Sequence, residues 1–170
     1  MTDYEVAIVG FGPVGAVAAC LLGQAGIRTL VIDRSETIYD KPRAVALDHE
    51  IARVLQGIGL AGALADCAEP FTDSVYFGAD GRVIKRLTML PEPHPQGWMP
   101  SMVFMQPVLE AAVRDRVHAF PSVSVELGQA LTDLRQDSET AFLDIAGPAG
   151  RKTITARYVI GCDGASSTVR

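Results

Sequence analysis

The chain opens on Val6-Ala7-Ile8-Val9-Gly10-Phe11-Gly12-Pro13-Val14-Gly15, an apolar run that passes directly into three glycines spaced as G-x-G-x-x-G. This spacing predicts a buried strand, a tight turn and a helix that begins near Pro13. Gly10 allows the turn, Gly12 lets the backbone approach a pyrophosphate, and Gly15 lets the helix pack closely on the strand. The stretch therefore predicts a dinucleotide site on a β-α-β unit.

The residues after this turn complete the unit. The pattern predicts a helix that ends at Gly26 and a second strand over Thr29 to Ile32. Asp33 ends that strand, where a carboxylate accepts hydrogen bonds from a ribose diol. Pro13 and Val14 belong to the first helical turn, whose free N–H groups and positive dipole favour phosphates. Arg34 follows Asp33, and it either neighbours an adenosine or faces solvent.

Composition limits the classes of function. The chain has 170 residues, 48% of them hydrophobic, which is enough for one core of ordinary domain size. A net charge of -5 and scattered basic residues argue against a nucleic-acid partner. The cysteines and histidines lack paired spacing, so neither a disulfide framework nor a metal site is expected. The uncharged run from Val6 to Ile27 is broken by glycines and follows acidic residues, so we expect no membrane span and a cytoplasmic location.

The rest of the sequence predicts an α/β fold, a Rossmann-like parallel sheet with helices and an additional antiparallel hairpin and meander. A polar loop passes through Lys41-Pro42, and a proline-rich extended loop covers 89–101. Helices are expected over 46–56, 60–67 and 107–118, and strands over 71–78, 82–87, 123–127, 130–136, 141–145, 151–155 and 157–160. The last strand delivers its following residues to the carboxyl edge of the sheet, where open α/β sheets bind ligands.

The closing residues, Gly161-Cys162-Asp163-Gly164-Ala165-Ser166-Ser167-Thr168-Val169-Arg170, specify the nucleotide further. Asp163, Gly164, Ser167 and Arg170 match a D-G-x-x-S-x-x-R pattern. With the glycine-rich opening, this pattern resembles the FAD-binding half of the single-component flavoprotein aromatic hydroxylases, the p-hydroxybenzoate hydroxylase-like family. Pro42-Arg43-Ala44, Gly97-Trp98 and Met105-Gln106-Pro107 look most like hydroxylases of 3-(3-hydroxyphenyl)propionate and similar phenols, and the resemblance covers nearly all of the chain.

The resemblance implies further contacts with FAD. Asp163 and Gly164 correspond to a step that contacts the pyrophosphate side of the flavin. Arg43, in an Arg43-Ala44 step at the head of a helix, corresponds to an arginine that reaches the pyrophosphate or ribityl region. Gln106, which opens the next helix, corresponds to a residue near the same atoms. Without the resemblance, the sequence would indicate only that Arg43 is a solvated loop residue.

The resemblance also implies an activity. In that family NAD(P)H reduces FAD, the reduced flavin captures O₂ as a C4a-hydroperoxyflavin, and oxygen passes to a small phenolic substrate. The cofactor performs this chemistry, so no catalytic acid or base is assigned. We expect residues 1–170 to be an FAD-binding portion that is incomplete and inactive alone, with residues 71–101 contributing to an otherwise missing substrate-binding domain.

Two other functions fit part of the pattern. An NAD-dependent dehydrogenase shares the β-α-β opening and Asp33. If the chain were one, its match to the closing D-G motif would be a coincidence. A non-catalytic nucleotide-binding module is favoured by the short length. Binding of flavin, of NAD or of neither separates these three functions.

Overall fold

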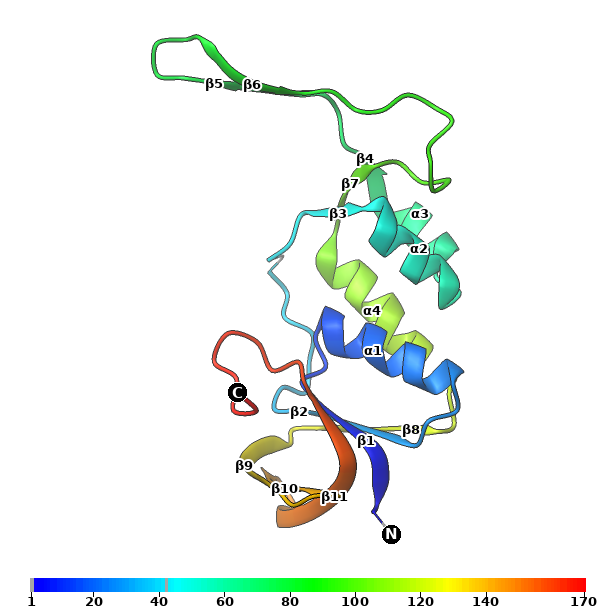
Figure 1. The fold of residues 1–170 in the computed structure, drawn as a ribbon, viewed down its shortest axis with the longest axis vertical. Coiled ribbons are helices and arrows are strands. Elements are labelled where there is room, and N and C mark those ends of the chain that lie inside the picture. The colour runs from blue at the N-terminus through cyan, green and yellow to red at the C-terminus, as the bar shows by residue number, and fades with distance from the viewer. Residues whose placement is uncertain (1, 42) are drawn as a thin grey trace. The chain divides into compact units, whose positions relative to one another are not determined.

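The computed structural model describes residues 2–41 and 43–170. Contacts along the chain define two units (Figure 1). One contains the residues up to Asp40 together with Glu110–Arg170, and the other contains Lys41–Leu109. Pro42, which belongs to the loop expected through Lys41-Pro42, lies outside the described residues.

The first unit is built on one six-stranded sheet. Its strands are β1 (Tyr4–Val9), β2 (Thr29–Asp33), β8 (Val123–Leu127), β9 (Ala130–Gln136), β10 (Ala141–Gly147) and β11 (Gly150–Gly161), in the order β8-β2-β1-β11-β10-β9. β8, β2, β1 and β11 are parallel, and β9, β10 and β11 form an antiparallel meander. β11 belongs to both parts because its first half pairs with β10 and its second half with β1.

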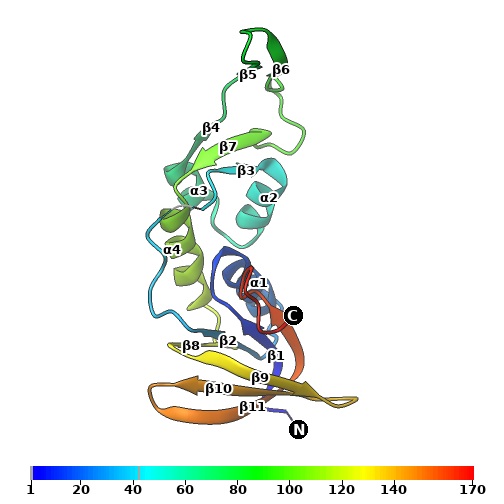
Figure 2. The same cartoon turned by 90° about the vertical axis from the view of Figure 1, so that its left-hand side faces the viewer.

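The two faces of β1 and β2 are covered by different elements. α1 (Pro13–Gln24) contacts β1, β2 and β8 on one face, and the meander lies on the other (Figure 2). Ala7, Val9, Leu30 and Ile32 join the apolar side chains of the meander in one buried cluster. Burial on both faces explains why these parallel strands are apolar throughout.

α4 (Gln106–Val117) belongs to the first unit from Glu110 onward, and that part contacts α1. The Cys20 thiol lies 3.6 Å from the Val113 carbonyl oxygen, within the range of a weak S–H hydrogen bond. A Cβ at Gly23 would lie 2.6 Å from the Phe120 ring, so glycine lets the ring pack against α1.

The second unit has short elements. They are β3 (Ala46–Asp48), α2 (His49–Gly57), α3 (Ala61–Cys67), β4 (Ala68–Pro70), β5 (Ser74–Phe77), β6 (Val83–Leu87) and β7 (Ser101–Phe104). β3, β7 and β4 form an antiparallel sheet in that order, while β5 and β6 form a separate hairpin. Leu47, Leu55, Ile58, Leu64 and Met102 are among its buried side chains.

The predicted fold class is confirmed, and the expected strands over 123–127 and 130–136 have the predicted bounds. The helix expected from Ala46 was wrong at its start, because 46–48 pair with β7 and Asp48 then caps α2 by accepting from the Ile51 N–H at 2.9 Å. Arg43 and Ala44 therefore precede a strand rather than a helix. The two strands expected over 151–155 and 157–160 are one strand, β11.

In the part of the chain that the structure describes, no helix is both long enough and apolar enough to cross a membrane.

Candidate functional site

The candidate site lies where three parallel strands end. β1 is hydrogen-bonded to β2 on one side and to β11 on the other, with Val9 opposite both Ile32 and Gly161. The Gly10 N–H donates to the Ile32 carbonyl at 2.8 Å, and the Cys162 N–H donates to the Val9 carbonyl at 2.6 Å. The glycine-rich turn and the closing D-G motif, far apart in sequence, therefore meet at one edge of the sheet.

The three glycines of the turn have different surroundings. Gly10 has φ +104°, and a Cβ there would collide with the Cys162 carbonyl. A Cβ at Gly15 would collide with the Gly10 carbonyl. Gly12 has open space where a Cβ would stand. Gly10 and Gly15 thus serve packing within the protein, whereas Gly12 leaves its backbone accessible to a ligand.

The N-terminus of α1 begins at the same turn. Pro13 occupies its first position, and the Ala16 N–H makes the first helical bond, to the Gly12 carbonyl at 2.9 Å. The N–H groups of Val14 and Gly15 precede that bond and have no helical partner. The first turn carries no acidic residue, and the Val14 side chain is 72% exposed. This helix end is suited to an anion.

Asp33 shapes the turn in the structure. Its Oδ2 accepts from the Phe11 N–H at 2.6 Å, and its Oδ1 accepts from the Ser35 N–H at 2.7 Å. Each carboxylate oxygen has a second lone pair, so the ribose interaction expected from the sequence is compatible with these bonds. Arg34 is exposed.

The closing D-G motif is folded by its own side chains. The Asp163 carboxylate accepts from the Ser167 hydroxyl at 2.7 Å and from the N–H groups of Thr168 at 2.6 Å and Val169 at 3.3 Å. The Arg170 guanidinium donates to the Gly164 and Ala165 carbonyls. Gly164 has φ +82°, and a Cβ there would meet nothing within 4 Å. Asp163 and Arg170 therefore hold the loop, and Gly164 presents open backbone.

The titration of two residues in this loop follows from these contacts. Burial opposes ionisation of Asp163, but the hydrogen bonds from Ser167, Thr168 and Val169 outweigh it and lower the pKa of the carboxyl group. Burial and the nearby Asp163 charge raise the pKa of the Cys162 thiol. At neutral pH the loop thus carries a carboxylate used in hydrogen bonds and a protonated thiol, which is a poor nucleophile.

The remaining sequence candidates lie in the second unit. The buried Gln106 side chain accepts through Oε1 from the backbone N–H groups of Arg43 and Ala44, each at 2.8 Å. One carboxamide oxygen thus fixes the Arg43-Ala44 segment, and this contact joins two positions that the sequence singled out separately. The Arg43 side chain is exposed.

The sequence analysis missed a buried ion pair beside the glycine-rich turn. Glu110 and Arg114, on successive turns of α4, are 3% and 9% exposed, and their charged groups are 2.8 Å apart. The Arg114 guanidinium carbon lies 4.7 Å from the centroid of the Phe11 ring. The only sequence signal was an acidic and a basic residue four apart next to the apolar face of a helix, a pattern that is usually solvated.

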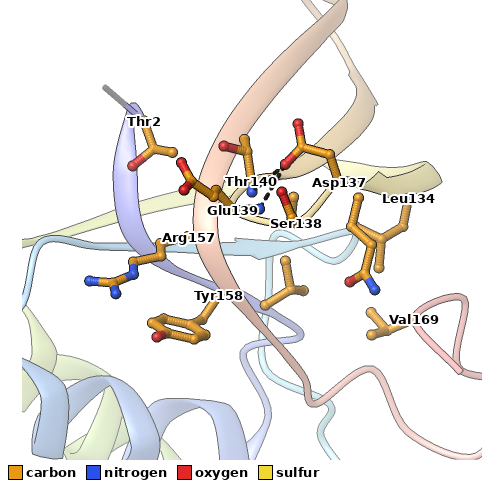
Figure 3. Close-up of a pocket in the computed structure, with 12 residues that line it drawn as sticks. Thr2, Leu134, Asp137, Ser138, Glu139, Thr140, Arg157, Tyr158 and Val169 are labelled. Carbon is orange, nitrogen blue, oxygen red and sulfur yellow. Dashed lines mark hydrogen bonds between the residues drawn. The ribbon is translucent and has the colours of Figure 1, made fainter.

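A surface hollow lies elsewhere in the first unit (Figure 3). It is lined by the β9–β10 turn and by part of β11, including Asp137, Thr140, Arg157 and Tyr158. In Figure 3 the Asp137 carboxylate turns back to accept from the Glu139 and Thr140 N–H groups. Val169 of the closing loop lines this hollow, but neither the glycine-rich turn nor the Asp163-Gly164 step does.

The parallel β8-β2-β1-β11 arrangement, with a glycine-rich turn and helix N-terminus at its carboxyl edge, defines a dinucleotide-binding α/β protein of the Rossmann type. The chain belongs to the FAD-binding domain family, whose model matches residues 3–170. The geometry of the site fits FAD. Gly12 and Gly164 leave open backbone at one sheet edge, and α1 offers N–H groups to the pyrophosphate of the cofactor.

Two curated relatives are hydroxylases. The chain is 36% identical over 166 residues to the 3-(3-hydroxy-phenyl)propionate/3-hydroxycinnamic acid hydroxylase of Mycolicibacterium smegmatis, covering 98% of this chain and 29% of that protein. It is 36% identical over 169 residues to a hydroxylase of the same name, numbered 1, from Burkholderia vietnamiensis, covering 99% and 27%. The chain thus spans about three-tenths of the length of the curated relatives it matches.

Solved structures share the fold. The p-nitrophenol 4-monooxygenase PnpA of Pseudomonas putida DLL-E4 matches with a TM-score of 0.86 and 28% identity over 100% of this chain and 43% of that one. OxyS anhydrotetracycline hydroxylase of Streptomyces rimosus matches with a TM-score of 0.80 and 29% identity over 98% and 33%.

Proposed function

We propose that this chain is the FAD-holding part of a flavoprotein monooxygenase that hydroxylates a small phenolic substrate with O₂ and NAD(P)H. The observation that carries the proposal is the meeting of the glycine-rich turn and the Asp163-Gly164 step at one sheet edge. The names of the relatives support the substrate class, since both curated hydroxylases described above act on hydroxylated aromatic acids by name.

The candidate contacts to FAD are proposed residue by residue. The glycine-rich turn binds the pyrophosphate through Gly10, Gly12, Pro13, Val14 and Gly15. The open space beside Gly12 supports this assignment. Asp33 binds the ribose and Arg34 neighbours the adenosine, while Asp163 and Gly164 contact the pyrophosphate side of the flavin. The family resemblance assigns Arg43, Ala44 and Gln106 to the ribityl and pyrophosphate region, and the Gln106 side chain fixes the Arg43-Ala44 segment by accepting from both N–H groups.

The protein's own part in the reaction is to bind and orient. FAD, when bound, supplies the electron transfer and oxygen chemistry. The Asp33 and Asp163 side chains accept hydrogen bonds from backbone N–H groups, so each fixes a turn at which FAD is proposed to bind. The raised pKa of Cys162 keeps its thiol protonated beside the turn. None of these groups acts as an acid or base in the proposal.

Residues 71–101 belong, in this proposal, with the substrate-binding part of the longer enzyme. Support comes from β5 and β6, which pair only with each other among the described residues and leave Tyr76, Phe77, Val83 and Ile84 exposed. We place the enzyme in the cytoplasm, where NAD(P)H is present and where free cysteines stay reduced.

The test uses the longer gene product that contains this chain. Purified enzyme is mixed with NADH or NADPH, and oxidation of the nicotinamide is followed with and without 3-(3-hydroxyphenyl)propionate. The proposal predicts a flavin spectrum and oxidation that the phenol stimulates, with a hydroxylated product. A protein that retains NAD and oxidises a hydroxyl substrate without O₂ consumption would show a dehydrogenase instead.

A further inference from the structure

The Glu110–Arg114 pair is unusual for its burial. Both charged residues are almost fully enclosed, at 3% and 9% exposure, and their charged groups meet at 2.8 Å on one helix. Removing two charges from water costs free energy that their attraction only partly returns, and apolar side chains of similar volume often hold a fold equally well. Stability alone therefore does not account for the pair.

The guanidinium of this pair contacts the glycine-rich turn. Arg114 lies over the Phe11 ring at 4.7 Å, and the ring is 1% exposed. Phe11 stands between Gly10 and Gly12, so its side chain is the only one in that part of the turn. The backbone of Phe11 is fixed separately, because its N–H donates to Asp33.

These contacts fix the segment that faces a ligand. Glycines on either side give the turn conformational freedom, which contacts to the residue between them reduce. The ring held by Arg114 and the N–H held by Asp33 are two such anchors on one residue. Both contacts act on the segment that precedes Gly12 and the first N–H groups of α1.

We infer that Arg114 is a positioning residue for FAD binding, held by Glu110 and acting through the Phe11 ring on the glycine-rich turn. The inference rests on the proposed FAD function. Its physical basis is preorganisation, because a turn already in the binding conformation loses less entropy when the pyrophosphate arrives.

Arg116 provides a matched control. Its guanidinium carbon lies 4.7 Å from the Phe120 ring, on the same helix as Arg114 and at the same distance. Phe120 contacts Gly23 at the far end of α1 rather than the glycine-rich turn. Arg116→Met therefore removes a comparable cation–ring contact that has no part in the proposal.

The experiment compares the 170-residue chain with Arg114→Met, with Glu110→Leu/Arg114→Met and with Arg116→Met. The dissociation constant for FAD comes from fluorescence titration, and the unfolding midpoint of the ligand-free protein is measured alongside. We expect roughly tenfold weaker FAD binding in both Arg114 variants. The double variant should keep the wild-type midpoint or exceed it, because it leaves no unpaired buried charge. Arg116→Met should bind FAD as wild type does.

Amide hydrogen exchange supplies a readout without ligand. Exchange at Gly12, Val14 and Gly15 should be faster in the double variant than in Arg116→Met. If wild type binds no FAD, the proposed function fails and this exchange still decides the role of Arg114. Unchanged FAD affinity or unchanged exchange in a folded double variant overturns the inference. If neither Arg114 variant folds, the pair is structural and the inference is also overturned.

Discussion

At the scale of single residues, Gly12 and Gly15 are three positions apart but should respond to substitution in opposite ways. Gly12→Ala adds a methyl group in open space at a negative φ, so the fold should survive. The same methyl group lies where the pyrophosphate approaches, so FAD affinity should fall by about tenfold or more. Fluorescence titration and thermal unfolding of the variant measure the two effects.

Gly15→Ala is the counterpart. Its Cβ would collide with the Gly10 carbonyl, and backbone atoms cannot yield cheaply. We expect a loss of stability of about 1–3 kcal/mol, visible in urea unfolding before any ligand is added. Equal stability for the two variants would contradict the division between an open glycine and a packed one.

The lowered pKa of Asp163 makes the stability of the fold depend on pH. Its pKa in the folded state lies below the reference value of 3.8, so the stabilisation that its carboxylate provides is complete above that pH. It is lost as the pH falls through the folded pKa. Asp163→Asn should cost about 1–2 kcal/mol near neutral pH, and the gap from wild type should shrink in acid below 3.8. Urea unfolding of both proteins across that pH range measures the gap.

Ser167→Ala is the control for this prediction. It removes one donor but leaves the carboxylate with the Thr168 and Val169 N–H groups. Ser167→Ala should therefore destabilise the protein less than Asp163→Asn does. The Ser167→Ala variant should still lose stability as the pH falls through the folded pKa of Asp163. A gap between wild type and Asp163→Asn that stays constant down to acid pH would show that the loop does not depend on the ionised carboxylate.

At the scale of elements, the start of α4 should control the segment before β3. Gln106→Leu removes the acceptor for the Arg43 and Ala44 N–H groups, at a cost of about 1–3 kcal/mol. Exchange of these two amides should speed up. Gln106→Glu keeps an acceptor oxygen for these N–H groups, so their exchange should stay slower than in Gln106→Leu even though the buried carboxylate costs stability. Equally fast exchange in both variants would show that the carboxamide oxygen does not fix this segment.

The sequence predicts strongly patterned strands best. The predicted bounds of β8 and β9 agree with the structure, whereas the 12-residue β11 was predicted as two strands. β3, β4 and β7 have only three or four residues, and β4 contains Pro70, so periodicity has too few residues to work with. Their pairing is set by contacts distant in sequence, which local patterns do not report.

The candidate site divides in the same way. Gly10, Gly12 and Asp33 were predicted because strand, turn and acidic residue stand in a fixed order. Arg114 was not, because its importance comes from the Phe11 ring more than 100 residues away in sequence, and nothing local marks it as buried. Contacts of this kind become visible only when the packing of α4 is known.

At the scale of the whole molecule, the β5–β6 hairpin should affect behaviour in solution. Phe77 and Ile84 are 63% and 74% exposed, and the hairpin pairs with no other strand among the described residues. Such a surface favours association between copies. Phe77→Lys/Ile84→Lys should lower light scattering in concentrated samples and change stability by less than about 0.5 kcal/mol. If light scattering does not fall and the unfolding midpoint is unchanged, the copies associate through another surface.

The central claim is that two distant motifs form one FAD site. The most direct measurement is a titration of the 170-residue chain with FAD, followed by flavin fluorescence and repeated in the presence of excess NAD. We predict saturable binding of one FAD per chain that NAD does not displace, and weaker binding in Gly12→Ala. Binding of NAD in place of FAD, or an equal affinity for FAD in wild type and Gly12→Ala, would contradict the account.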